Sequence, residues 1–92
     1  MDKAEQRAQW LQEVEVANRI CELLRDSAVL GAFARLEADA ILDWRESERH
    51  EQARQSDAWH RLRALDDLKQ KLQSIVTTGE IAAKSLEEMK RG

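Results

Sequence analysis

The sequence contains no proline and no tyrosine, and only three glycines and one cysteine among its 92 residues. With so few helix-breaking residues, tight hairpin turns are disfavoured and long helices are favoured. The single cysteine, Cys21, excludes an internal disulfide and a cysteine-based zinc site. No apolar run approaches the length of a membrane span, and the charged start at Asp2, Lys3 and Glu5 does not fit a signal peptide. We therefore expect an all-α, non-membrane protein of a reducing intracellular compartment.

The sequence also lacks a strong excess of either acidic or basic residues. The chain has 15 basic and 18 acidic residues, a net charge of −3, and the two signs are interleaved. Residues 1–44 carry nine acids and five bases, and residues 45–92 carry nine and ten. Neither half has the strongly basic surface that non-specific nucleic-acid binding requires. A nucleic-acid partner is not favoured, and a DNA-binding packaging or regulatory role is kept as a lesser alternative.

Apolar residues recur at helical spacing in three segments, which indicates three amphipathic helices. The predicted helices cover about residues 3–25, 28–46 and 50–78, followed by a short tail helix at 80–90. The stripes are Trp10, Val14, Ala17, Cys21 and Leu24; then Val29, Phe33, Leu36, Ala40 and Trp44; then Ala58, Leu62, Leu65, Leu68, Leu72 and Ile75. These stripes predict an all-α fold, a small bundle or helical hairpin of about three helices in one domain over residues 1–92.

The breaks between the helices are less sharply marked. Asp26-Ser27 is a capping signal between the first two helices, which are either antiparallel neighbours or nearly one bent helix. The polar residues 45–57 hold the main turn or form a solvated first segment of the third helix, with Ser47 and Ser56 as candidate N-caps.

Thr77-Thr78-Gly79 predicts the end of the third helix, since glycine adopts the left-handed conformation of a helix stop without steric cost. The tail helix would follow this stop.

No residue pattern predicts catalysis, a cofactor or a metal site. His50 and His60 are ten residues apart in the most polar part of the chain, so we expect two solvated histidines rather than ligands. Cys21 lies within an apolar stripe without a neighbouring base, which favours a buried core thiol over a nucleophile. Enzymatic activity is therefore the least expected class of function.

The tryptophans carry the most information about partners. Trp44 ends the second apolar stripe, so we expect a buried indole. Trp59 lies just off the third stripe, where core and interface roles are equally compatible with its position, and tryptophan is enriched in interface hot spots. The leucine seam beside it suits pairing between helices, of two chains or within one chain. The predicted partner-binding or oligomer-forming residues are Trp59, Leu62, Leu65, Leu68, Leu72 and Ile75.

The order of landmarks over about residues 23–83 resembles small helical proteins from the virion-assembly gene sets of tailed bacteriophages and prophages. The residues concerned are Leu30-x-x-Phe33-x-x-Leu36-Glu37, Ile41-x-x-Trp44-Arg45, Trp59-x-x-Leu62-x-x-Leu65 and Ile75-x-x-x-Gly79. The resemblance implies a phage origin and a role through protein contacts, for example in head assembly. It implies no catalytic role.

Two functional hypotheses follow for the host cytoplasm or the virion. The first is a protein-interaction module that forms homo-oligomers or docks on a larger assembly, such as the phage head or connector. The alternative is a small phage inhibitor that binds and blocks a host defence or regulatory protein. Both act through a surface and need no cofactor.

Overall fold

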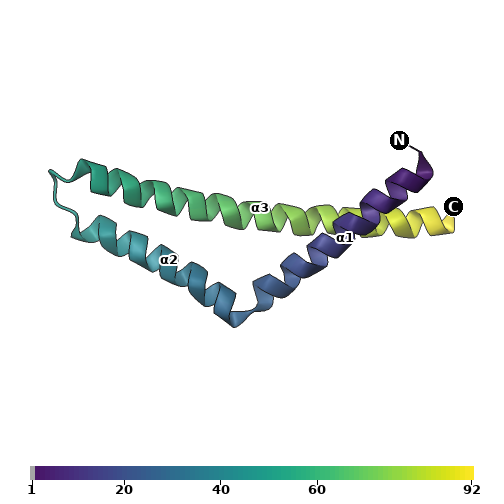
Figure 1. Cartoon of the computed structure of the whole chain (residues 1–92), viewed down its shortest axis with the longest axis horizontal. Coiled ribbons are helices and arrows are strands. Elements are labelled where there is room, and N and C mark those ends of the chain that lie inside the picture. Colours follow the sequence, from purple (N-terminus) through teal and green to yellow (C-terminus); the bar gives the residue numbers. More distant parts are fainter. Residues whose placement is uncertain (1) are drawn as a thin grey trace. The chain divides into compact units, whose positions relative to one another are not determined.

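The computed structural model describes residues 2–92, which form three α-helices and no strand (Figure 1). Helix α1 spans Lys3–Arg25, α2 spans Ser27–Glu46 and α3 spans Gln52–Arg91. The first two helices have the predicted bounds to within one residue. The all-α prediction is confirmed for the described part of the chain.

Acidic side chains cap the first two helices. The backbone N–H of Glu5 donates to Asp2 Oδ1 at 2.8 Å at the start of α1. Asp26 is the only residue between α1 and α2, and its carboxylate accepts from the backbone N–H groups of Ala28 at 2.8 Å and Val29 at 3.4 Å. Because Asp26 has extended backbone angles, it ends one helix and starts the next, so α1 and α2 are separate elements.

The connection from α2 to α3 occupies residues 47–51. Ser47 closes α2: its backbone N–H donates to Asp43 O at 3.1 Å, and its hydroxyl donates to Trp44 O at 2.6 Å. Before α3, Glu51 Oε1 accepts from the backbone N–H of Glu48 at 3.0 Å. The predicted N-cap roles of Ser47 and Ser56 are therefore wrong, since Ser47 is a C-cap and Ser56 lies inside α3.

The predicted helix end at Gly79 and the separate tail helix at 80–90 are also wrong. Helix α3 continues through Gly79 to Arg91, and none of the described glycines has the positive φ of a helix stop. The reason for a glycine here is space. A Cβ built on Gly79 would overlap the Cβ of Ala17 in α1, and it would lie 3.1 Å from the carbonyl oxygen of Glu13.

The chain forms two compact units that share α3. Unit 1 consists of the residues up to Arg25 together with Lys71–Gly92, so it pairs α1 with the C-terminal part of α3. Unit 2 consists of Asp26–Gln70 and pairs α2 with the N-terminal part of α3. Each unit pairs two helical segments, and the prediction of one domain over residues 1–92 stays a prediction.

Unit 1 is held by a close helix crossing. Ala17 is the only buried residue of α1, and Val76, Gly79 and Ala82 are the buried residues opposite it on α3. Because these side chains are small, the backbones of the two helices approach closely. Cys21 is half-buried beside this crossing rather than fully buried as predicted.

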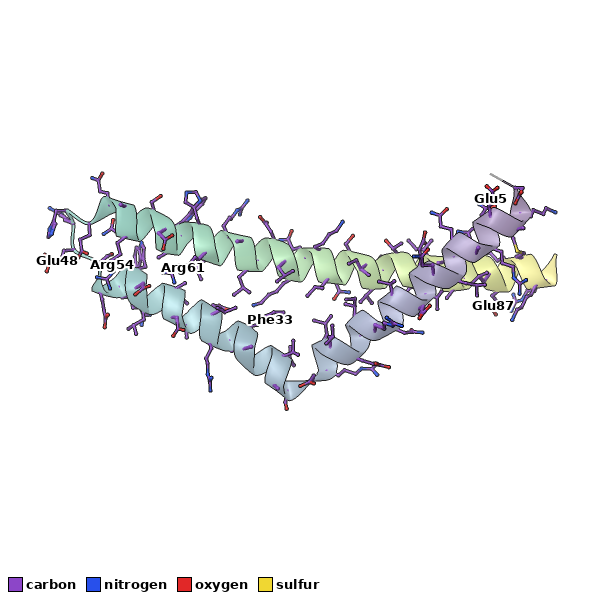
Figure 2. All side chains as sticks on the ribbon, viewed as in Figure 1. Glu5, Phe33, Glu48, Arg54, Arg61 and Glu87 are labelled. Atoms are coloured by element: carbon purple, nitrogen blue, oxygen red, sulfur yellow. The ribbon has the colours of Figure 1, made fainter. Side chains whose placement is uncertain are left out.

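Unit 2 is an antiparallel hairpin, with α2 and the first part of α3 side by side in Figure 1. Ala40 of α2 and Ala58 of α3 are fully buried, and Leu65 is the only larger side chain that is buried there, at 9% exposure. Phe33 extends from α2 toward α3 (Figure 2) and is half-buried. The core of this unit is therefore a narrow line of mostly small side chains.

The prediction that Trp44 is buried is wrong, because its side chain is 55% exposed. Ala40 takes the buried position one turn earlier on α2. Asp43, which is half-buried, takes the polar contacts to α3 near the end of the helix. Trp44 is left on the flank of the last turn of α2.

Candidate functional site

Large apolar side chains remain exposed on both units. Among residues 2–92, unit 1 exposes four of them and unit 2, which has nearly the same length, exposes six. Contiguous exposed apolar surface on a small protein marks an interaction site, whereas scattered single residues need no explanation. The exposed set is Leu11, Val16, Leu23 and Ile81 in unit 1, and Leu30, Leu36, Leu42, Trp44, Trp59 and Leu68 in unit 2.

The structure separates the six predicted partner-binding residues into three groups. Leu65 is buried inside unit 2, so it serves the hairpin itself. Leu62, Leu72 and Ile75 are half-buried. Trp59 and Leu68 are exposed, and they are the two members of the set with most surface left for a partner.

Leu68 lines an open groove on one flank of the unit 2 hairpin. The groove has a volume of about 320 Å³ and receives residues from both helices. We call it the Leu36–Leu68 groove, after its two exposed leucines, of which Leu36 is 57% and Leu68 is 45% exposed. Its walls are Leu36 and Asp39 of α2 with Arg61, Ala64, Leu65 and Leu68 of α3.

An ion-pair cluster joins the two helices near the loop end of this groove. Arg61 Nη2 lies 2.5 Å from Asp43 Oδ2, and Arg54 Nη2 lies 3.4 Å from Asp43 Oδ1. Figure 2 shows both arginines extending from α3 toward α2. Arg54 also approaches Glu51 at 3.5 Å, and Arg61 approaches Asp57 at 3.2 Å. The cluster fixes the side chain of Arg61, which is also a groove residue.

Asp43 gives this cluster a pH dependence. The hydrogen bond from Arg61 is the main cause that lowers the pKa of Asp43 below its ordinary value, and Arg54 adds to it. A carboxylate whose pKa is lower in the folded state stabilises the fold above its unfolded pKa, and this contribution is lost as the pH falls through the folded pKa.

We therefore expect Asp43→Asn to lower the melting temperature at neutral pH, with the difference from wild type shrinking below about pH 4. Thermal unfolding followed by circular dichroism at several pH values measures this. Asp67→Asn, an exposed acid outside the cluster, is the matched control and should change little. A deficit of Asp43→Asn that persisted unchanged at acidic pH would contradict the assignment.

The flank of unit 2 on the other side from the Leu36–Leu68 groove has a more polar centre than that groove. Lys69 Nζ lies 3.2 Å from Glu37 Oε2, and these residues line a second, smaller groove with Leu62, Leu65 and Asp66. Trp44 and Trp59 line neither groove. The ring of Trp59, 54% exposed, meets the ring of His60 edge to face at a centroid distance of 5.0 Å.

Unit 1 also has two open grooves between α1 and α3. One is lined by Val16 and Ile75 among polar residues, and the other by Leu11, Leu86 and Met89 between Arg7 and Lys90. These two grooves of unit 1 contain one exposed leucine, Leu11, whereas the Leu36–Leu68 groove of unit 2 contains two.

His50 Nδ1 lies 3.5 Å from Glu48 Oε2, and both side chains are exposed. No group of three or more His, Cys, Asp or Glu side chains suited to hold a metal ion occurs within residues 2–92. His50 and His60 are both exposed, as predicted from their polar surroundings. Cys21 is a free thiol beside Ala17 and Gly79, with no base lining the same groove except Glu80.

No protein-family model, no curated protein and no solved structure matches this chain. No helix within the described residues is both long enough and apolar enough to cross a membrane. The exposed apolar flanks therefore stand as the candidate functional surfaces on the geometry alone.

Sequence reasoning missed Leu36 and the Asp43–Arg61 pair. Leu36 falls within the second apolar stripe, so the pattern places it in the core with Phe33 and Ala40. Asp43 and Arg61 are 18 residues apart, and only the hairpin brings them together. The one signal available was the position of Asp43 on the apolar side of α2, where a charged residue needs a partner.

Proposed function

We propose that this chain is a non-enzymatic protein-interaction module that acts by self-association or by docking on a larger assembly. The observation that carries this proposal is the number of large apolar side chains exposed on paired helices, six of them on unit 2 alone. Complete burial of an exposed leucine by a partner contributes about 1.5–3 kcal/mol, and roughly half of that remains available for each of these half-exposed side chains. A surface of this kind favours association.

The resemblance to small virion-assembly proteins supports a phage origin and a larger assembly such as the head or connector as the docking site. Its landmarks Leu36, Trp44 and Trp59 are three of the exposed residues.

The test compares the wild-type chain with a surface variant that carries Leu11→Asp, Leu36→Asp and Leu68→Asp. Two differently tagged copies are expressed in bacteria that carry a tailed phage, and the bound proteins are identified. We expect wild type to retain a second copy or a virion protein, and the surface variant to lose it while keeping its helical spectrum. An Asp67→Arg control should behave as wild type. If wild type and the surface variant bind the same proteins, or if neither binds any, the proposed function is contradicted.

Trp59 provides a separate prediction. Because its ring is largely exposed, Trp59→Ala should leave the melting temperature nearly unchanged but weaken partner binding by at least about 2 kcal/mol, as expected of an interface anchor. Asp67→Ala, at an exposed position of the same helix, is the control and should change neither the melting temperature nor the binding. Thermal unfolding and binding of the captured partner are measured for both variants. A large loss of stability in Trp59→Ala would show that this residue is a core residue.

A further inference from the structure

The helices of unit 1 and the helices of unit 2 are paired by different kinds of contact. Four ion pairs join α2 to α3 in unit 2, namely Arg54–Asp43, Arg54–Glu46, Arg61–Asp43 and Lys69–Glu37. Between α1 and α3 of unit 1, no hydrogen bond or ion pair occurs among the residues that the structure describes, since each polar contact there stays within one helix. Packing alone therefore holds α1 on α3.

This packing buries only small side chains. The buried residues of the crossing are Ala17, Val76, Gly79 and Ala82. None of them is larger than valine, and Trp10, the largest side chain of α1, is only half-buried. Burial of apolar surface is the dominant favourable contribution to folding. The pairing of α1 with α3 is therefore the weaker of the two helix pairings.

The covalent connections also leave α1 free to separate. Its partner segment, Lys71–Gly92, follows only after the whole of unit 2. Asp26 is the single residue that joins α1 to α2, and its side chain and carbonyl oxygen accept hydrogen bonds from Ala28, Val29 and Leu30 of α2. The cap of α2 therefore does not require α1 to stay in place.

We propose that α1 is a releasable strap, which opens from residues 71–92 of α3 while unit 2 stays paired. Segments with few buried apolar contacts open locally at a lower free energy than the rest of a protein. The proposal goes beyond the proposed function, because it concerns a change of state within the chain rather than a partner.

Release of the strap changes the surface that unit 1 presents. Val76, Gly79 and Ala82 are spaced three residues apart on α3, which places them on one face of the helix, and all three are buried in the closed state. When α1 leaves, this face of small residues becomes accessible. Helix α1 therefore acts as an autoinhibitory cover of its own partner face.

The test is native-state hydrogen exchange of the full chain, followed residue by residue by NMR. We expect the backbone N–H groups in the middle of α1 to have protection factors at least about tenfold lower than those in the middle of α2. The reason is that α1 exchanges through the local opening of unit 1, whereas α2 requires unit 2 to open.

Gly79→Ala tests whether the crossing holds the strap. The added Cβ overlaps the Cβ of Ala17, so the protection factors of α1 should fall by about tenfold or more, while those of α2 change by less than about threefold. Ala17→Gly added to Gly79→Ala returns the missing space and should raise the protection of α1 again. Gly31→Ala is the matched control, because its Cβ would meet no atom within 4 Å, and it should leave the protection of α1 unchanged.

Equal protection of α1 and α2 in the wild-type chain would overturn the proposal, because the chain would then open as one unit. The proposal would also be wrong if Gly79→Ala lowered the protection of both helices equally or left that of α1 unchanged, or if Ala17→Gly restored nothing. None of these measurements involves a partner, so the strap can be refuted while the capture experiment still supports the proposed function.

Discussion

Gly31→Ala and Gly79→Ala are expected to change stability in opposite directions, although both glycines lie inside helices. A Cβ on Gly31 of α2 would meet no atom within 4 Å. Alanine there should stabilise the chain by about 0.5–1 kcal/mol, because glycine is the poorer helix former. A Cβ on Gly79 would overlap the Cβ of Ala17, which is attached directly to the backbone of α1 and has no freedom to turn away.

Gly79→Ala must therefore separate α1 from α3, and we expect a net loss of about 1–3 kcal/mol, as found for overpacked cores. Gly79→Leu should cost more and leave unit 1 largely unpaired. Chemical denaturation followed by circular dichroism measures all three variants. Ala17→Gly in the Gly79→Ala background returns the missing space, so the double variant should be more stable than Gly79→Ala alone. Stabilisation by both single glycine substitutions would show that the helices of unit 1 do not cross closely at this point.

Leu65→Ala is expected to give the largest loss of stability among single truncations in unit 2. Leu65 is the only large side chain buried between α2 and α3. Truncation of a buried leucine to alanine typically costs about 2–5 kcal/mol, a large part of the total stability of a small domain. Because a loss of 1 kcal/mol lowers the melting temperature of a domain of this size by roughly 4–8 °C, the expected shift is large.

Leu42→Ala is the control for this prediction. The two substitutions remove the same atoms, but Leu42 is exposed on the outer side of α2. Its replacement should change stability by no more than about 0.5 kcal/mol. Equal shifts in the melting temperature for both variants would mean that Leu65 does not form the core of the hairpin.

Local chemistry explains which parts of the fold could be predicted from the sequence. The bounds of α1 and the start of α2 depend on Asp2 and Asp26, whose carboxylates act within three residues of themselves. A capping residue and an apolar period are both visible in a short window. For this reason the first two helices and the all-α class were predictable.

Gly79 shows why the course of the chain in its C-terminal half could not be predicted from the sequence. The local sequence Thr77-Thr78-Gly79 is the same whether the glycine ends a helix or lies inside one and leaves space for a neighbouring helix. The deciding contact is with Ala17, 62 positions earlier, and no local pattern reports it.

The candidate site was predictable only in part, for a related reason. An apolar stripe shows that one side of a helix avoids water, but its width does not show which edge a single partner helix covers. In α2 the partner covers Ala40 and leaves Leu36 and Trp44 exposed on either edge. Trp59 and Leu68 are exposed, but their role in binding stays a prediction, whereas the exposure of Leu36 depended on the hairpin.

The small buried residues have a consequence for the evolution of this fold. In most proteins the large core residues are the ones that selection preserves, and small residues drift. Here the position with least freedom is Gly79, where an added Cβ would overlap the Cβ of Ala17, and the small residues Ala40 and Ala58 are fully buried. We therefore expect distant relatives of this chain to share the spacing of its alanines and its internal glycine.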